Sequence, residues 1–414
     1  MSGVALDKIC HIITKLELGG AQKITLRTVA HLDRSRFSPV LIVGGEPAEL
    51  DEAAAKLSGV ELYRVPTLGR AIRPLRDFRA LLYMIRLLRT IRPAVVHTHS
   101  SKAGIVGRWA ARFAGVPVII HSVHGFGFTP EQHPIVKRWL IQLERWTSSV
   151  TDWVFTDSES NRRQGIELEI FRPDRSAMLP PGIDLSAIQT VQVDREKKRR
   201  SLGLDPQKPV VGVVAPFKPQ KAPLDFVRVA AAVSRLRSQV QFVMVGDGEL
   251  RAAVEKEIRR FGMSDSIVLA GWRRDVPEVM KCLDVFLLTS RWEGLPRVYL
   301  EAACCGVPIV GTAVDGAAEV VVDGVNGFLR EPGDIDGLAE KVVWFLDHPK
   351  EADAMGRSGR DLSSRFDCYE VVRQQEDRYE VLLSVYKSKR KVLPDPCCNG
   401  SEGEAARAEA GSDY

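Results

Sequence analysis

Short apolar runs recur along the whole chain, each bounded by turn-forming residues and followed by a stretch with helical spacing of its apolar positions. The runs are continuous rather than alternating, which is typical of strands buried on both faces of a parallel sheet. They lie at residues 9–14, 39–43, 94–98, 116–121, 153–156 and 177–179, and again at 210–215, 240–245, 266–270, 284–289 and 307–310. This alternation of strands and helices predicts two doubly wound, parallel-sheet α/β domains.

The same pattern divides the chain into five segments. We expect a Rossmann-like domain over residues 1–190, a polar linker over 191–208 and a second Rossmann-like domain over 209–366. The linker contains the charge run from Arg195 to Arg200, which suits a solvated segment better than a binding patch. An amphipathic helix at 367–386 is expected to pack back on the first domain, and the charged, weakly apolar residues 387–414 predict a disordered tail.

The composition is that of a globular protein, with 414 residues, 45% hydrophobic and 27% charged. No apolar run approaches the roughly 18 residues that a membrane span needs, and the first residues lack the layout of a secretory signal. The seven cysteines form no CxxC pair and have no histidine at metal-ligand spacing. We therefore predict a cytosolic protein with no metal ion and no disulfide framework.

Positive charge is concentrated in the first half of a chain whose net charge is +5. Residues 70–92 alternate arginines with leucine, isoleucine and phenylalanine and contain Asp77 as their single acid. A basic amphipathic helix of this kind can lie on an anionic membrane surface, although a packed helix with a solvated arginine face gives the same pattern. Because no nucleic-acid-binding motif accompanies the charge, we expect no nucleic-acid partner.

The most informative segment follows the run at 284–289. It places Glu293 in a loop, Pro296 at the start of the next helix and Glu301 about one turn into that helix. Free N–H groups at a helix start favour a phosphate, and carboxylates accept hydrogen bonds from hydroxyls. The set suits a nucleotide sugar, whose hydroxyls flank a diphosphate. Spacing alone would equally suit surface glutamates that stabilise the helix dipole.

Other candidate residues lie where predicted strands end. Gly19 and Gly20 allow a backbone to approach a ligand closely, or make a plain tight turn. Lys221 can neutralise the charge of a departing diphosphate in place of a metal ion. His124 is either a substrate contact or a structural loop residue, and Trp272 follows the run at 266–270.

Several motifs resemble those of the retaining glycosyltransferases of family 4, which have the GT-B fold. Glu293-Gly294-Leu295-Pro296 with Glu301 eight positions after Glu293 is the most specific of them. Further landmarks follow the family order from about residue 9 to about residue 332: Gly19-Gly20-Ala21-Gln22, His97-Thr98-His99-Ser100, His121-Ser122-Val123-His124-Gly125, Pro181-Gly182-Ile183-Asp184, Pro219-Gln220-Lys221, Gly246-Asp247-Gly248 and Asn326-Gly327-Phe328.

The resemblance implies a hexosyltransferase that moves a sugar from a UDP- or GDP-sugar to a hydroxyl acceptor with retention. The second domain would bind the donor and the first the acceptor, with no metal or cofactor. The implied acceptor is a lipid-linked or other envelope glycan precursor, which would bring the enzyme to the inner face of the cytoplasmic membrane. Two alternatives remain open: a sugar-nucleotide epimerase or hydrolase of the same fold, and a catalytically weak nucleotide-sugar-binding partner subunit.

The resemblance also implies roles for single residues. Glu293 would bind the hydroxyls of the donor sugar and Glu301 the ribose. Backbone amides around Gly294, Leu295 and Pro296 would contact sugar or phosphate. The Gly19-Gly20 loop would reach over the diphosphate, and His124 would lie near the sugar 6-position. Trp272 would stack on the nucleobase, which the family usually places after the strand expected at 266–270. Lys221, Glu293 and His124 form the implied catalytic set.

One position departs from the family pattern. Family members commonly have an arginine where this chain has Pro216. The departure puts the composition of the phosphate clamp in question, and Lys218 is close enough in sequence to substitute.

Overall fold

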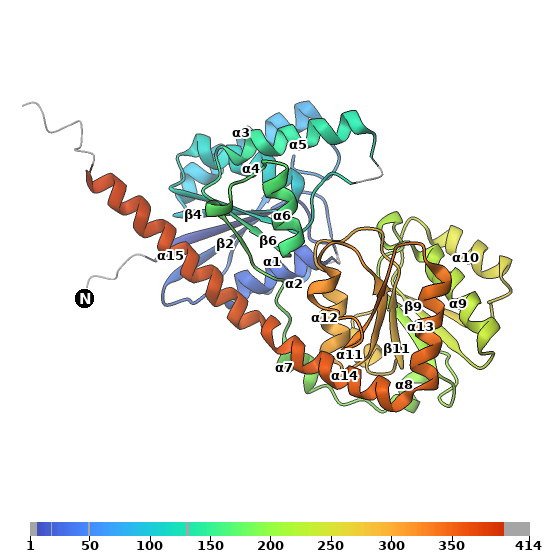
Figure 1. The fold of residues 1–414 in the computed structure, drawn as a ribbon. Coiled ribbons are helices and arrows are strands. Elements are labelled where there is room, and N and C mark those ends of the chain that lie inside the picture. Colours follow the sequence, from blue (N-terminus) through green and yellow to red (C-terminus); the bar gives the residue numbers. More distant parts are fainter. Residues whose placement is uncertain (1–5, 18, 49, 130–131, 393–414) are drawn as a thin grey trace, which may run out of the picture.

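The protein contains two parallel sheets, each flanked by helices (Figure 1). The computed structural model describes residues 6–17, 19–48, 50–129 and 132–392. In the first sheet the strands lie side by side in the order β3-β2-β1-β4-β5-β6-β7. They are β1 Asp7–Ile13, β2 Phe37–Gly44, β3 Glu61–Val65, β4 Val95–His99, β5 Val118–Val123, β6 Trp153–Thr156 and β7 Ser176–Met178. The prediction of a doubly wound α/β fold is confirmed.

The second sheet repeats this plan with the order β10-β9-β8-β11-β12-β13. Its strands are β8 Val210–Val214, β9 Gln241–Val245, β10 Ile267–Gly271, β11 Val285–Leu288, β12 Ile309–Thr312 and β13 Gly327–Arg330. The strand order reverses between β1 and β4 in the first sheet and between β8 and β11 in the second. Ligands of doubly wound sheets bind at such switch points, outside the carboxyl ends of the strands.

Helices cover both faces of each sheet (Figure 1). Those that accompany the first sheet are α1 Gly20–His31, α2 Asp51–Ala55, α3 Pro74–Ile91, α4 Ser101–Ala114, α5 Pro134–Ser148 and α6 Glu159–Glu167. Those that accompany the second are α7 Leu185–Gln189, α8 Arg195–Ser201, α9 Pro223–Leu236, α10 Arg251–Arg260, α11 Val276–Met280, α12 Arg297–Cys304, α13 Ile335–Asp347 and α14 Pro349–Ser363. No helix in the described ranges is long and apolar enough to cross a bilayer.

Two strands, β3 and β13, are missing from the expectations drawn from the sequence. Both are edge strands. In β3 the polar Glu61 and Arg64 alternate with apolar residues, and of its five residues Val65 alone is buried. An edge strand exposes one side and part of its faces, so it lacks the continuous apolar run that marks the central strands.

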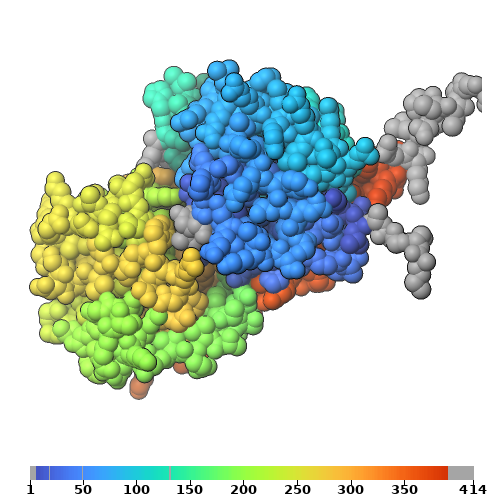
Figure 2. All heavy atoms as spheres, turned by 180° about the vertical axis from the view of Figure 1, so that it is seen from behind, coloured from blue at the N-terminus to red at the C-terminus, as the bar shows by residue number. Residues whose placement is uncertain are grey.

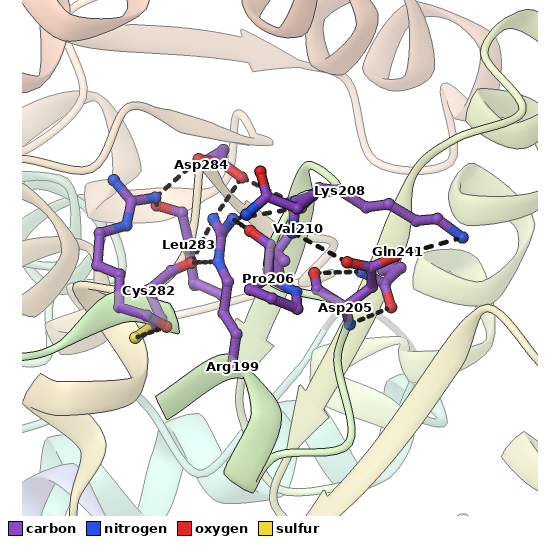
Figure 3. A network of polar contacts seen from close by, with 11 residues as sticks. Arg199, Asp205, Pro206, Lys208, Val210, Gln241, Cys282, Leu283 and Asp284 are labelled. Atoms are coloured by element: carbon purple, nitrogen blue, oxygen red, sulfur yellow. Dashed lines mark hydrogen bonds and ion pairs between the residues drawn. The ribbon is translucent and has the colours of Figure 1, made fainter. Parts of the chain in front are cut away.

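The segment predicted as a linker, residues 191–208, is anchored to the second sheet. It contains α8, whose Arg199 is buried. The Arg199 guanidinium donates to the Cys282 carbonyl at 2.8 Å, to Asp284 Oδ2 at 2.7 Å and to the Pro206 carbonyl at 3.0 Å (Figure 3). Such a residue cannot be recognised within a charge run, because the sequence does not show which of several neighbouring arginines is buried.

The last described helix, α15 Cys368–Val392, crosses from the second half of the molecule to the first (Figures 1 and 2). Val371, Val372, Tyr379 and Leu383 pack with residues of the first sheet, among them Ile9, Phe37, Val95 and Trp153. The helix continues past residue 386, so the predicted disorder is wrong for residues 387–392. Lys387 contacts Asp7 at 3.2 Å, and positive charge at a helix C-terminus is favourable. Residues 393–414, with Cys397 and Cys398, lie outside the described ranges.

Candidate active site

Loops from the carboxyl ends of both sheets face each other across a cleft of about 400 Å³. Figure 2 shows the two halves that meet along it. The predicted residues that line the cleft are Gly19, Gly20, His124, Lys221, Trp272, Glu293, Gly294, Leu295 and Glu301. Pro296 is not among the lining residues; it is buried at the N-cap position of α12. The cleft therefore brings together candidates that lie far apart in the sequence.

A buried ion pair lies on the second-sheet side of the cleft. Lys221 Nζ is 2.5 Å from Glu293 Oε1, and their side chains are 15% and 6% exposed. Ser290 Oγ donates to the same carboxylate oxygen at 2.6 Å. In this arrangement one Glu293 oxygen holds the ammonium group and the hydroxyl, while the carboxylate retains further lone pairs for a ligand's hydroxyls.

Asp315 holds the backbone of the Glu293 loop. Its Oδ2 accepts a hydrogen bond from the Glu293 amide at 2.5 Å. Burial raises the pKa of the Asp315 carboxyl, while the bond from the Glu293 amide opposes the shift. Asp315 begins the short helix after β12, and it has positive φ (39°), a strained conformation for a residue other than glycine. A strained backbone of this kind persists only where surrounding contacts stabilise it, and at Asp315 the bond to the Glu293 amide is such a contact.

The two halves touch where the loop of Glu293 meets the loop after β5. A Cβ on Gly294 would lie 2.6 Å from the His124 carbonyl oxygen. A Cβ on Gly316 would likewise lie 2.6 Å from Ser158 Cβ. Glu319 adds a polar contact, since its carboxylate accepts from the Glu159 and Ser160 amides at 3.1 Å, at the N-terminus of α6. Gly294 is thus required by close approach of the two domains.

Positive charge surrounds Glu301, one turn into α12. Arg297 Nη2 is 3.4 Å from Glu301 Oε1, with side chains 10% and 13% exposed. Lys23, on α1 of the first half, also lines the cleft. Burial lowers the pKa of the Lys23 ammonium, the neighbouring Glu301 opposes that shift, and Arg297 and Arg27 add to it. Nε and Nη1 of Arg297 are buried with no partner among the described residues. Buried, unpartnered N–H groups beside a carboxylate suit an anionic ligand that also offers hydroxyls.

His124 turns its ring nitrogens away from a ligand. Nδ1 is 3.0 Å from both oxygens of Asp157, and Nε2 is 3.1 Å from His99 Nδ1. The side chain is 10% exposed. What His124 can present to the cleft is therefore its backbone and its ring edge, while both nitrogens are used within the first domain.

Pro216 and Trp272 lie on loops that follow strands of the second sheet and line the cleft. Pro216 follows β8, and it lines the cleft together with Lys218 and Lys221. Both lysines therefore lie near the position where family members commonly carry an arginine, and Lys221 is paired with Glu293. Trp272 follows β10 and is 51% exposed.

Sequence reasoning missed the residues that support the candidates. Asp157, Ser290 and Asp315 each bond to a candidate residue, yet nothing in their local spacing distinguishes them from other loop residues. His11, His97 and His99 were also missed as a group, although all three are buried and their nitrogens lie within 4.8 Å of one another. The available signal was a set of histidines inside or next to the apolar runs at 9–14 and 94–98.

Two facing doubly wound domains with a polar cleft between them define the GT-B fold. Solved structures share this fold: the HepE protein of Anabaena, in complex with UDP and glucose, superposes with a TM-score of 0.79 at 21% identity, over 91% of this chain and all of its own. WaaG, a glycosyltransferase involved in lipopolysaccharide biosynthesis, gives 0.74 at 18% identity over 90% of this chain and 99% of its own.

The family follows from sequence comparison. The family described as glycosyl transferases group 1 matches residues 194–362, and the glycosyl transferase 4-like domain matches residues 19–182. The chain is 32% identical to the Escherichia coli UDP-Gal:alpha-D-GlcNAc-diphosphoundecaprenol alpha-1,3-galactosyltransferase, over 90% of this chain and 96% of that one. It is 27% identical to the Bacillus subtilis protein EpsF, a putative glycosyltransferase by its description, over 86% and 90%. The chain belongs to the group 1, family 4 type glycosyltransferases.

Proposed function

We propose that the protein is a retaining hexosyltransferase that moves a sugar from a UDP-sugar to a hydroxyl of a lipid-linked glycan precursor. The observation that carries the proposal is the Lys221–Glu293 pair, held at 2.5 Å on one side of the cleft, with Glu301 on the next turn of the same segment. Glu293 would accept hydrogen bonds from the donor sugar and Glu301 from the ribose. The diphosphate between them would lie at the start of α12, where backbone N–H groups and Arg297 favour an anion.

In the proposed reaction the bond between the anomeric carbon and the diphosphate oxygen breaks, and the acceptor oxygen forms a bond to the same face of that carbon. The acceptor's proton passes to the departing diphosphate oxygen, so no separate base is needed. Lys221 would stabilise the charge that develops on the diphosphate, which is the task a metal ion has in other sites. The remaining contribution of the cleft is to hold donor and acceptor in register.

Uridine is the proposed base. The relative at 32% identity uses UDP-galactose by its name, and the HepE structure holds UDP. Trp272, exposed at the β10 end of the cleft, would lie against the base. An epimerase or a hydrolase of the same fold would place only the sugar itself or water on the acceptor side of the cleft. No observation favours either of these two activities.

A lipid-linked acceptor is supported by the surface of the first half. Apolar side chains are exposed near the N-termini of α3 and α5, including Ile72 (72%), Leu75 (81%), Ile135 (73%) and Trp139 (56%). Right-handed β–α–β connections make these helices run parallel, so both N-termini lie at the cleft end of the sheet. The arginines of residues 70–92 flank the apolar residues of α3. We propose that this edge lies on the anionic inner surface of a membrane and receives the acceptor from it.

Nucleotide binding is the first test. The melting temperature would be measured with UDP, GDP and ADP, each with and without EDTA, for the wild type and Glu301→Ala. Selective stabilisation by UDP that survives EDTA and is lost in the variant supports the donor site. A matched Glu331→Ala variant, altered at an exposed position outside the cleft, should respond like the wild type. Stabilisation by none of the three nucleotides would contradict the proposal and favour a weak partner subunit.

Membrane attachment is tested separately. Cosedimentation with vesicles of anionic and of zwitterionic phospholipid would compare the wild type with a Leu75→Ser/Trp139→Ser double variant. We expect binding to the anionic vesicles only, weakened at least roughly tenfold in the variant because two exposed apolar anchors are lost. Equal binding of both proteins would refute this surface while leaving the donor site untouched.

A further inference from the structure

A row of buried polar rings runs through the first sheet from the cleft to α15. His11 lies on β1, and His97 and His99 lie on β4, all at most 1% exposed. His11 and His97 are direct neighbours in the β1–β4 ladder. The His97 and His99 rings stack with centroids 4.5 Å apart, and those of His11 and His99 stack at 5.2 Å.

Hydrogen-bond distances join these rings into one chain. It starts at Asp157, which lies 3.0 Å from His124 Nδ1. His124 Nε2 is 3.1 Å from His99 Nδ1, and His99 Nε2 is 2.9 Å from His11 Nδ1. The Tyr379 hydroxyl of α15 ends the chain, at a long 3.5 Å from His11 Nε2 and at 2.7 Å from His97 Nδ1. We call Asp157, His124, His99, His11 and Tyr379 the histidine relay.

The proton count of the inner rings follows from their burial. Burial lowers the pKa of His11 to about 3, and it also lowers the pKa values of His97 and His99 well below the usual range. Each of these rings is therefore neutral near pH 7 and has one donor nitrogen and one acceptor nitrogen. At His97 the Gln375 amide donates to Nδ1 at 2.9 Å, so the ring proton lies on Nε2, which donates to Ser122 Oγ at 2.8 Å.

The relay couples the proton positions of its rings. The Tyr379 hydroxyl has one proton and lies within hydrogen-bond distance of both His97 Nδ1 and His11 Nε2. Because His11 and His99 each carry one ring proton, the group that donates at His11 Nε2 determines the donor at His11 Nδ1 and, one ring further, at His99 Nδ1. The last of these bonds joins His99 Nδ1 to His124 Nε2.

We propose that the histidine relay holds the His124 ring in a fixed orientation, and that Tyr379 is a positioning residue for sugar transfer. The inference rests on the proposed function. Tyr379 would act through His11, His99 and His124, because it has no place in the cleft itself. It would also explain why α15 returns to the first sheet: the helix supplies the group that ends the relay.

The effect would reach the substrate through the backbone. The His124 carbonyl lies against Gly294, so the orientation of the His124 loop sets how closely the Glu293 loop approaches the first domain. The charged and titratable groups around His124 are Asp157 after β6, His99 on β4, His121 on β5 with the Arg108–Glu144 pair behind it, and the Lys221–Glu293 pair across the cleft. Of these, Asp157 alone forms an ion pair with His124 in the part of the chain that is described.

Nitrogen-15 labelling of the histidines of the full chain tests the proposal. Long-range proton–nitrogen NMR spectra report which nitrogen of each ring carries a proton, and His124→Gln assigns the His124 signals. We expect His11 and His99 each to be a single tautomer, with one protonated nitrogen, near pH 7. Tyr379→Phe removes the group that ends the relay at His11 Nε2, so the tautomers of His11 and His99 should change or become mixed.

Tyr386→Phe is the matched control, since it removes a hydroxyl from the same helix without touching the relay, and its spectra should equal those of the wild type. In a transfer assay Tyr379→Phe should lower kcat roughly tenfold and leave the KM for the UDP-sugar unchanged, as expected for lost positioning.

Tautomers of His11 and His99 that Tyr379→Phe leaves unchanged would overturn the proposal. Stoichiometric uptake of Zn²⁺ by the three inner histidines would overturn it too, since the rings would then hold a metal. Failure of UDP to bind would instead count against the proposed function, because the spectra do not depend on nucleotide.

Discussion

The two halves of the molecule share one fold but carry different chemistry where they meet. At the cleft end of the second sheet the polar groups are charged: Lys221, Glu293 and Glu301 lie on consecutive loops and the helix that follows. At the cleft end of the first sheet they are mostly imidazole rings, linked to one another and to Tyr379. At equivalent strand ends, the second half therefore has ionic contacts, and the first half has a chain of hydrogen bonds made mostly by imidazole rings.

This difference indicates which task each half of the molecule is suited to. Buried charges in close pairs create strong local fields that stabilise charge on a bound phosphate. Neutral imidazole rings supply little net charge. When both nitrogens of a ring are hydrogen-bonded, however, the ring is held in one orientation, because the proton positions of its neighbours allow no other. The second half is therefore suited to the chemistry of the donor, and the first to the alignment of the acceptor side.

The largest effect is expected for Arg199, a buried charge in the second half that stabilises the fold. Arg199→Met should destabilise the protein by about 3–5 kcal/mol, because Asp284 and the Cys282 carbonyl would lose their buried partner. Arg200→Met, next to it but 61% exposed in a surface pair with Glu196, should change stability by less than about 0.5 kcal/mol. Urea unfolding of both variants measures this. Equal effects would mean that the segment 191–208 is the solvated linker that its composition suggests.

Removal of the central carboxylate charge should have the next largest effect. Glu293→Gln should lower kcat about 100- to 1000-fold, since the amide leaves Lys221 without its partner and weakens the contacts to the donor sugar. Steady-state transfer assays report the loss, and unchanged melting of the variant excludes unfolding as its cause. Glu331→Gln, at an exposed position, should keep full activity. A Glu293→Gln enzyme within threefold or so of the wild type would show that the charge contrast between the halves is not catalytic.

A smaller effect is expected at the ribose end. Glu301→Gln should weaken UDP binding by roughly 10- to 100-fold, the cost of one or two hydrogen bonds to a charged acceptor. Isothermal titration with UDP and with uridine separates the contributions. Both ligands should lose affinity by a similar factor, because Glu301 is expected to contact the ribose they share. A loss confined to UDP would instead assign Glu301 to the ordering of Arg297 at the diphosphate.

The last expected effect is a difference between the two halves in how much stability they lose at acid pH. For His11 burial lowers the folded-state pKa to about 3, below its usual value of 6.5, so the unfolded state binds more protons between these values. Stability is therefore lost as the pH falls below about 6.5, by up to about 1.4 kcal/mol per pH unit for each such ring. The pKa values of His97, His99 and His121 are lowered by burial in the same direction.

Hydrogen exchange at pH 7.5, 6 and 5, corrected for the intrinsic rate, would locate this loss. Strands β1, β4 and β5 should lose protection before β8, β9 and β11, since the second half has His348 as its only histidine and that residue is exposed. His348→Gln should leave the profile unchanged. Simultaneous loss in both sheets would mean that the buried rings do not set the acid limit of the first half.

The sequence predicted the central strands, because Val, Ile and Leu runs buried on both faces leave a continuous apolar pattern. It did not predict β3 and β13, whose edge positions permit residues such as Glu61 and Arg330. The loop residues Lys221, Glu293 and Glu301 could be proposed because they follow predicted strands and match family motifs. Arg199, Asp315 and the relay could not, because their roles depend on which residues the fold brings into contact.

The relay also shows where a sequence signal was present but could not be interpreted. His11, His97, His99 and His121 all lie in apolar runs, where polar rings need partners. That need is visible from the sequence, but the partners are not: β1 and β4 are neighbours across a switch point, and Tyr379 arrives from a helix some 280 residues further along. Only the register of the sheet and the path of α15 show that the rings satisfy one another.

The central claim is that the charged half transfers a sugar from a UDP donor with retention. Its most direct test is incubation with UDP-α-galactose and a GlcNAc-diphospholipid acceptor, followed by proton NMR of the purified product. The account predicts a disaccharide with an α-linked galactose, formed in the presence of EDTA and missing with Glu293→Gln. A β-linked product would contradict retention, and release of free galactose without transfer would identify a hydrolase.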